Sequence, residues 1–170
     1  MSSDNAQDAD NQQVIRKERI SDEYLAGFAD GEGCFYVGFS KRIDLPLGWQ
    51  IITEFHLSQN PQGKVILETF RERLGCGYIK PNHPKSLRDK TWVLIVKDRR
   101  DLKKRLIPFF RKHPIRSQKA NDLKVFTQVI DIIERGEHLT REGFNMIVEL
   151  VHASPKVNLK RYSKEDLLKT

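Results

Sequence analysis

Two neighbouring stretches of this sequence alternate between apolar and polar residues, and this pattern limits the fold more than any other feature. In the first stretch, residues 35–42, the apolar side chains are Phe35, Val37 and Phe39; in the second, residues 50–57, Ile51, Thr53, Phe55 and Leu57 alternate with mostly polar residues. A period of two with one polar face is typical of a half-buried antiparallel strand. Pro46 and Gly48 lie between the two stretches, so we expect a hairpin with a long loop.

The segments around this hairpin predict an α+β domain with the order α-β-β-α-β-β-α, followed by further helices. Ser21 is a good N-cap for a short helix that ends at Gly31 and Gly33. Asn60 and Pro61 are typical of the start of a second helix. We expect a second hairpin over 76–82 and 90–97, and helices over 98–113, 118–135, 140–152 and 163–169.

The chain of 170 residues has the length of one domain. We expect a disordered polar tail over 1–19, the core over 20–135, and a C-terminal helical extension of the same domain over 136–170. No apolar run approaches the length of about 18 residues that a membrane span needs. The sequence therefore predicts a soluble intracellular protein, in the cytoplasm of a prokaryote or inside an organelle if it is organelle-encoded.

The formal charge of +7 is concentrated in one part of the chain. Residues 80–119 hold 14 Lys and Arg against three Asp, a net charge of +11. Such segregation favours a polyanionic partner, either nucleic acid or an acidic membrane surface, although a solvated helix face is the alternative. The only cysteines, Cys34 and Cys76, lie far apart, which argues against a zinc site, a disulfide scaffold and an iron–sulfur centre.

Residues 25–33 read Leu-Ala-Gly-Phe-Ala-Asp-Gly-Glu-Gly and combine small residues with two acids. Ala26 and Gly27 would let another backbone approach the helix closely, and Gly31 would allow the chain to turn at its end. Glu32 would then project beside the first strand. A carboxylate held next to a basic surface can bind a hard divalent cation against phosphate oxygen; an exposed turn acid is the alternative.

This segment resembles the defining motif of the LAGLIDADG homing endonucleases, and the match continues into Cys34 and Phe35. The resemblance covers about residues 20–135 and includes the order of elements given above. It implies a site-specific endonuclease that cuts double-stranded DNA by metal-dependent phosphodiester hydrolysis. The family's active site needs two such helices and the motif occurs once here, so the resemblance implies a homodimer. Its interface would contain Leu25, Ala26, Gly27, Phe28 and Gly31.

The resemblance also implies an active site. The Glu32 carboxylate and the Gly31 carbonyl would bind Mg²⁺, for which Mn²⁺ or Ca²⁺ can substitute in binding. Gln59 matches a polar residue that orders water, and Arg116 matches a basic residue near the cut phosphate. Gly63 stands where a second basic residue is expected, and Lys64, which follows it, is our substitute. We expect neither a membrane partner nor a small-molecule substrate.

The even-numbered residues of the predicted strands form one polar face. The resemblance implies that this face lies in the major groove, where such side chains can read base edges. A strand of about nine residues spans roughly nine base pairs, so a dimer would read on the order of 20 base pairs, approximately palindromic. The expected DNA-binding residues are Tyr36, Ser40, Arg42, Gln50, Glu54, His56, Lys80, Asn82, Lys90 and Trp92, with Lys103, Lys104, Arg105, Arg111 and Lys112 on phosphates.

Two other functions fit parts of the sequence. The first is a non-cleaving nucleic-acid binder on the same fold, either an intron RNA splicing maturase or a DNA-binding regulator. Relatives of this kind often lose the second motif acid, and Glu32 is retained, so we favour cleavage. The second is a basic membrane-surface protein, which strand alternation within the basic stretch disfavours, since such proteins use one amphipathic helix.

Overall fold

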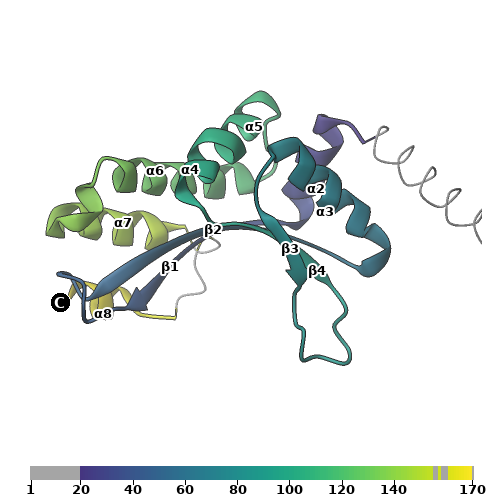
Figure 1. Ribbon diagram of the computed structural model, residues 1–170. Helices are drawn as coiled ribbons and strands as arrows, with labels where there is room; N and C mark the ends of the chain where they lie inside the picture. Colours follow the sequence, from purple (N-terminus) through teal and green to yellow (C-terminus); the bar gives the residue numbers. More distant parts are fainter. Residues whose placement is uncertain (1–19, 155–156, 158–160, 170) are drawn as a thin grey trace, which may run out of the picture.

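The chain forms a four-stranded antiparallel sheet with helices packed on one of its sides (Figure 1). This computed structural model describes residues 20–154, 157 and 161–169, so the predicted tail over 1–19 lies outside the described residues. Helix α2 (Asp22–Glu32) leads directly into strand β1 (Gly33–Lys41), which pairs with β2 (Trp49–Gln59) as a hairpin. The α+β class is confirmed.

The remaining elements follow the predicted order. A 3₁₀ turn η1 (Pro61–Gly63) and helix α3 (Lys64–Leu74) precede the second hairpin, whose strands β3 (Tyr78–Pro81) and β4 (Trp92–Val96) are shorter than predicted. The sheet order is β1-β2-β4-β3. The later elements are α4 (Arg99–Asp101), η2 (Leu102–Leu106), α5 (Ile107–Lys112), α6 (Lys119–Glu134), η3 (Glu137–Leu139), α7 (Arg141–Ala153) and α8 (Lys164–Leu168).

The helix predicted over 98–113 is divided into three parts. Its middle part, η2, is a π-helix, and α5 begins immediately after it with Pro108 in its first turn. Proline has no N–H to donate, and its ring clashes with the carbonyl four residues earlier in an α-helix. A wider π-turn accommodates this proline without ending the helical path.

A cluster of phenylalanines joins the inner face of the sheet to the helices. The ring centroid of Phe35 on β1 lies 5.2 Å from that of Phe55 on β2, 5.4 Å from that of Phe110 on α5 and 5.6 Å from that of Phe126 on α6. All four side chains are buried. Because odd-numbered residues of β1 and β2 face this cluster, the even-numbered residues face away from the helices.

The C-terminal part of the chain packs on the same core. The backbone N–H of Val37 on β1 donates to the carbonyl of Val157 over 2.9 Å, so the chain covers the outer edge of β1. Val157 and Leu167 are fully buried, and Tyr162 packs edge-to-face on Trp49. Within the described residues, no helix combines the length and the apolar character needed to cross a membrane.

The pairing of β4 corrects one prediction about the polar face. His56 pairs with Ile95 and Gln59 pairs with Trp92, so in β4 the odd-numbered residues share the polar face of β2. Trp92 therefore faces the helices, where the Lys64 ammonium lies 4.0 Å from the centre of its ring. The sequence of β4 is apolar at all five positions and offers no alternation from which to read its phase.

Candidate functional site

Glu32 is the last residue of α2, and its side chain is exposed. It has no hydrogen-bond or ion-pair partner among the described residues. The position of this carboxylate depends on Gly33, whose N–H caps the helix by donating to the carbonyl of Ala29. A Cβ at residue 33 would lie 2.5 Å from that carbonyl oxygen and 3.1 Å from the Phe55 ring. Glycine thus lets the chain pass directly from helix to strand and fixes Glu32 at the junction.

The other motif acid, Asp30, has a structural task. Its Oδ2 accepts the backbone N–H groups of Arg116 (3.0 Å) and Ser117 (3.1 Å), and its Oδ1 accepts the Ser117 hydroxyl. Burial alone would raise the pKa of Asp30, but these hydrogen bonds outweigh it and hold the pKa below its usual range. The two acids are therefore distinct: Asp30 anchors the segment before α6, and Glu32 is free.

Lys119 was missed by the sequence analysis, although its side chain reaches the end of α2. Its Nζ donates to the carbonyl of Gly31 over 3.0 Å and to that of Ala29 over 3.3 Å. Burial holds the pKa of Lys119 below its usual value, and the neighbouring Asp30, Cys34 and Glu32 offset this only in part. The contact joins residues 88 positions apart, so no local sequence pattern signals it.

Gln59 and Lys64 lie at the same end of the β1–β2 hairpin as Glu32. Gly33 pairs with Leu57, two residues before Gln59. The Gln59 Oε1 accepts the N–H of Asn60 over 2.6 Å, and its side chain covers Gly63, where a Cβ would come within 2.4 Å of it. The Lys64 Nζ lies 3.6 Å from a carboxylate oxygen of Glu68, so its charge is directed along α3.

Arg116 borders the outward side of α2. Its side chain is exposed and lines a cavity of about 360 Å³ together with Glu23, Ala26, Gly27, Asp30, Lys112, His113 and Pro114. Its backbone is fixed by Asp30, whereas its guanidinium has no partner among the described residues. The structure thus brings Glu32, Asp30, Lys119 and Arg116 around the C-terminal end of α2.

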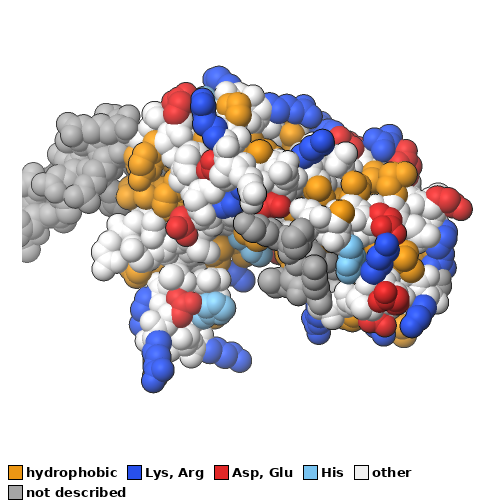
Figure 2. All heavy atoms as spheres, turned by 180° about the vertical axis from the view of Figure 1, so that it is seen from behind, with side chains coloured by type: hydrophobic (Ala, Val, Ile, Leu, Met, Phe, Trp, Pro, Cys, Tyr) orange, Lys and Arg blue, Asp and Glu red, His pale blue; other side chains and the backbone are white. Residues whose placement is uncertain are grey.

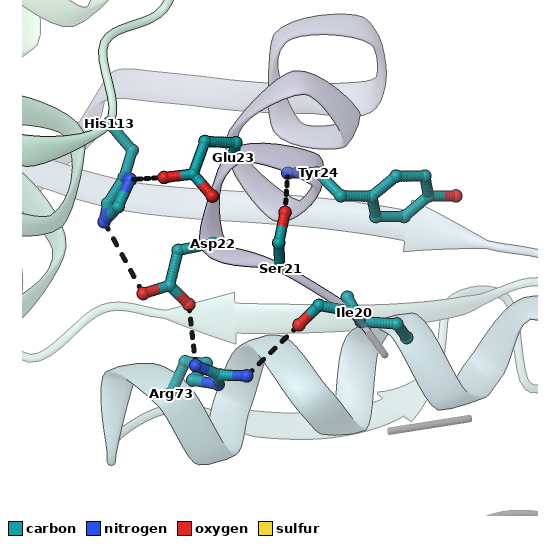
Figure 3. Close-up of polar contacts among 7 residues, drawn as sticks. All are labelled: Ile20, Ser21, Asp22, Glu23, Tyr24, Arg73 and His113. Carbon is teal, nitrogen blue, oxygen red and sulfur yellow. Dashed lines mark hydrogen bonds and ion pairs between the residues drawn. The ribbon is translucent and has the colours of Figure 1, made fainter. Parts of the chain in front are cut away.

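The N-terminal end of α2 is held by a separate group of side chains (Figure 3). The Ser21 hydroxyl caps the helix by accepting the N–H of Tyr24 over 3.1 Å. Asp22 lies between Arg73 (3.0 Å) and His113 (3.5 Å), as Figure 3 shows, and His113 Nδ1 lies 3.1 Å from Glu23. These contacts tie α2 to α3 and α5, so both ends of the helix are fixed.

The outward side of α2 differs from the predicted interface at two positions. Leu25 is fully buried and Ala26 is 4% exposed, so both pack mainly into the chain's own core and offer little surface to a second chain. Gly27 and Gly31 are exposed, and a Cβ on either would meet nothing within 4 Å. The side chain of Tyr24 is also exposed and stacks on Phe28, with ring centroids 6.5 Å apart.

Six of the predicted DNA-binding residues share the polar face that points away from the helices. The strand register places them there: Tyr36, Ser40, Gln50, Glu54, His56 and Lys80. Tyr36 pairs with Glu54, and the His56 Nε2 lies 2.8 Å from the Glu54 carboxylate. The Tyr36 ring also stacks on His56 at 6.4 Å. The face is therefore a connected polar surface.

The remaining predicted face residues lie elsewhere. Arg42 follows the end of β1, where its guanidinium pairs with Asp44 at 2.7 Å and reaches Gln50 at 3.4 Å. Asn82 and Lys90 lie in the loop between β3 and β4. Trp92 faces the helices, as described above, because β2 sets the register of β4.

The basic residues of η2 and α5 are not on the polar face. These elements pack against the inner face of the sheet, so Lys103, Lys104, Arg105, Arg111 and Lys112 lie on the opposite side of the molecule. Lys103 is paired with Asp131 and Glu134, and Arg105 pairs with Asp101 at 3.2 Å. Lys and Arg side chains gather both on the projecting β3–β4 loop and along the opposite, helical edge (Figure 2).

Comparisons with known proteins identify the family of this chain and similar solved folds. The family model described as LAGLIDADG endonuclease matches residues 25–130. A Neurospora crassa protein named "Probable intron-encoded endonuclease 2" is 30% identical over 132 residues, which cover 78% of this chain and 27% of that protein. The chain therefore spans about a quarter of the length of this curated relative.

Two solved structures resemble the fold. The homing endonuclease I-TnaI is 35% identical with a TM-score of 0.77, covering 88% of this chain and 96% of that one. I-SmaMI, bound to an uncleaved DNA target in the presence of calcium ions, is 30% identical with a TM-score of 0.72, covering 78% of this chain and 44% of that one. The match of the family model over more than half of the sequence, starting in the motif helix, shows that this chain belongs to the LAGLIDADG endonuclease family.

Proposed function

We propose that the protein is a site-specific endonuclease that cuts double-stranded DNA as a homodimer. The observation that carries this proposal is the free Glu32 carboxylate at the end of the motif helix, beside the Gly31 carbonyl and the basic side chains of Lys119 and Arg116. A carboxylate and a carbonyl set among cations suit a site that binds phosphate together with a divalent metal.

The donor groups of this site fit Mg²⁺. Glu32 and Gly31 both offer oxygen, which hard divalent cations prefer, and the Gly31 carbonyl already attracts the ammonium of Lys119. Among the described residues there is no cluster of three or more His, Cys, Asp or Glu that could hold a metal, so the proposed site relies on Glu32, the Gly31 carbonyl and phosphate oxygen. When bound, the metal would activate water and neutralise the leaving oxygen. Gln59 would order that water, and Arg116 would stabilise charge on the phosphate.

The homodimer is supported by the single motif and by the outward side of α2. Gly27 and Gly31 leave room for a second helix at close range, and Tyr24 and Phe28 flank them with apolar surface. The partner helix would then bring a second Glu32 to the other scissile phosphate. The near-complete coverage of I-TnaI, against under half of I-SmaMI, is consistent with a chain that carries one repeat.

The polar face of the sheet supports the proposal that the protein recognises a specific DNA sequence. Its side chains offer donors and acceptors suited to base edges, such as Gln50 for adenine and Lys80 for guanine. With β1 and β2 of 9 and 11 residues, each protomer would cover roughly nine base pairs. The two-fold axis of the dimer would make the target approximately palindromic.

A pooled library of random sites in plasmids, incubated with protein and Mg²⁺, tests the proposal. We expect double-strand ends at an enriched, approximately palindromic site. Glu32→Gln should bind that site and leave it uncut, while Glu23→Gln, which changes an acid at the other end of α2, should still cut. Tight binding with no enriched cut site would favour the non-cleaving alternative, and sedimentation as a monomer on DNA would refute the shared active site.

A further inference from the structure

The Lys119 side chain donates a hydrogen bond to the backbone carbonyl oxygen that the proposed metal site needs as a ligand. Its ammonium lies 3.0 Å from the Gly31 carbonyl oxygen, the backbone ligand assigned to the metal, and 3.3 Å from that of Ala29. The Glu32 carboxylate is close enough to act electrostatically on the same ammonium. A fixed cation and an incoming divalent cation therefore compete for one group of oxygens.

The fold holds Lys119 at this place. Lys119 is the first residue of α6, and a cation is disfavoured at a helix N-terminus. Its Nζ is stabilised instead at the C-terminal end of α2, where the helix dipole is negative. Asp30 fixes Ser117, and the Ser117 hydroxyl accepts the backbone N–H of Lys119 over 3.1 Å. The motif helix thus positions the residue that covers its own carbonyl.

We propose that the Lys119 ammonium acts as a resident cation on the Gly31 carbonyl, which the divalent metal must displace in order to bind. This inference rests on the proposed metal site and adds a positioning residue that sets the affinity of that site. Displacement exposes the carbonyl to the metal and moves the ammonium toward solvent, where a DNA phosphate can accept it. No covalent bond changes: the hydrogen bond from Lys119 to the Gly31 carbonyl is exchanged for coordination of the metal by the same oxygen.

The competition should change the affinity for divalent cations by a measurable factor. A unit charge about 5 Å from a divalent ion weakens its binding by roughly tenfold in the dielectric of water, and moving the ammonium away from the ion breaks its hydrogen bond to the Gly31 carbonyl instead. Lys119→Met removes the charge and keeps an unbranched side chain, so it should raise the affinity for divalent cations by about that factor. Lys119→Arg keeps the charge and should leave the affinity within about threefold of wild type.

Manganese provides a direct readout that does not depend on catalysis. Mn²⁺ would be titrated into the DNA-free proteins while the electron paramagnetic resonance signal of free Mn²⁺ is followed. The matched control is Lys124→Met, which removes an exposed lysine from the same helix and should bind like wild type. Lys119→Gln provides a second neutral variant in case the methionine protein does not fold, as checked by circular dichroism.

The expected result is tighter Mn²⁺ binding to Lys119→Met than to wild type, with the gain abolished when Glu32→Gln is added. Equal binding to both proteins, including no binding to either, or weaker binding to the variant, would overturn the proposal. A gain that survives Glu32→Gln would also refute it, because the ion would then lie elsewhere. Tighter Mn²⁺ binding in a protein that cuts no DNA would contradict the proposed nuclease activity and leave this inference standing.

Discussion

We expect Asp30 to contribute to the stability of the fold and Glu32 to contribute to the chemistry. A pair of alanine variants tests this division directly. In Asp30→Ala the backbone N–H groups of Arg116 and Ser117 and the Ser117 hydroxyl lose their acceptor. In Glu32→Ala no hydrogen bond or ion pair among the described residues is lost. The variants differ by two positions on one helix and remove the same type of group.

The expected loss for Asp30→Ala is about 2 kcal/mol. A hydrogen bond to a charged group contributes roughly 1.5–3 kcal/mol when it is well shielded. Asp30 is only partly buried, so water can replace much of what is lost, and the three contacts together should contribute no more than one or two shielded bonds. For a chain of this size the change lowers the melting temperature by about 4–8 °C. Glu32→Ala should stay within about 0.5 kcal/mol of wild type.

Urea unfolding followed by circular dichroism measures both changes. All proteins must be compared at one concentration, because association through α2 would add to the apparent stability. We expect a lower midpoint with an unchanged slope for Asp30→Ala. If Asp30→Ala unfolds at the wild-type midpoint, or Glu32→Ala loses as much stability, the division between an anchoring acid and a free acid is wrong.

Three further outcomes follow from the structure. The pKa of Asp30 is lowered by folding, so its stabilisation is present above the unfolded value of about 4 and lost as pH falls through the folded value; the deficit of Asp30→Ala in urea unfolding should therefore shrink in acid. Gly33→Ala should destabilise the fold by roughly 1–3 kcal/mol in thermal unfolding, because its Cβ would overlap the Ala29 carbonyl. Lys80→Ala should weaken binding to the preferred target by roughly 1–3 kcal/mol and relax the preference for guanine at one base pair of each half-site, as measured by fluorescence anisotropy on targets substituted at single positions.

Local patterns in the sequence were sufficient to predict most of the fold. The alternation of β1 and β2 and the caps at Ser21 and Asn60 involve neighbouring residues, and the structure has both strands and both helix starts where they were predicted. Glu32 was predicted at the helix end for the same reason, since Gly33 stops the helix immediately after it. Predictions that depended on a few adjacent residues were confirmed.

Predictions that depended on distant partners were less accurate. The phase of β4 is set by its pairing with β2, which a uniformly apolar strand does not reveal, and Trp92 was therefore assigned to the wrong face. Leu25 and Ala26 belong to the motif, but the rotation of about 100° per residue turns them inward, away from Gly27. The contact of Lys119 with the end of α2 exists because α6 packs there, and no pattern among neighbouring residues predicts it.

The basic helical edge described above bears on how the protein would find its target. Positive charge on both sides of the molecule attracts DNA at long range without selecting the face that arrives first. Initial encounters would then include many in which η2 and α5 touch the phosphates, and these complexes carry no sequence information. Reorientation on the DNA, and not diffusion to it, would be the slow step of the search.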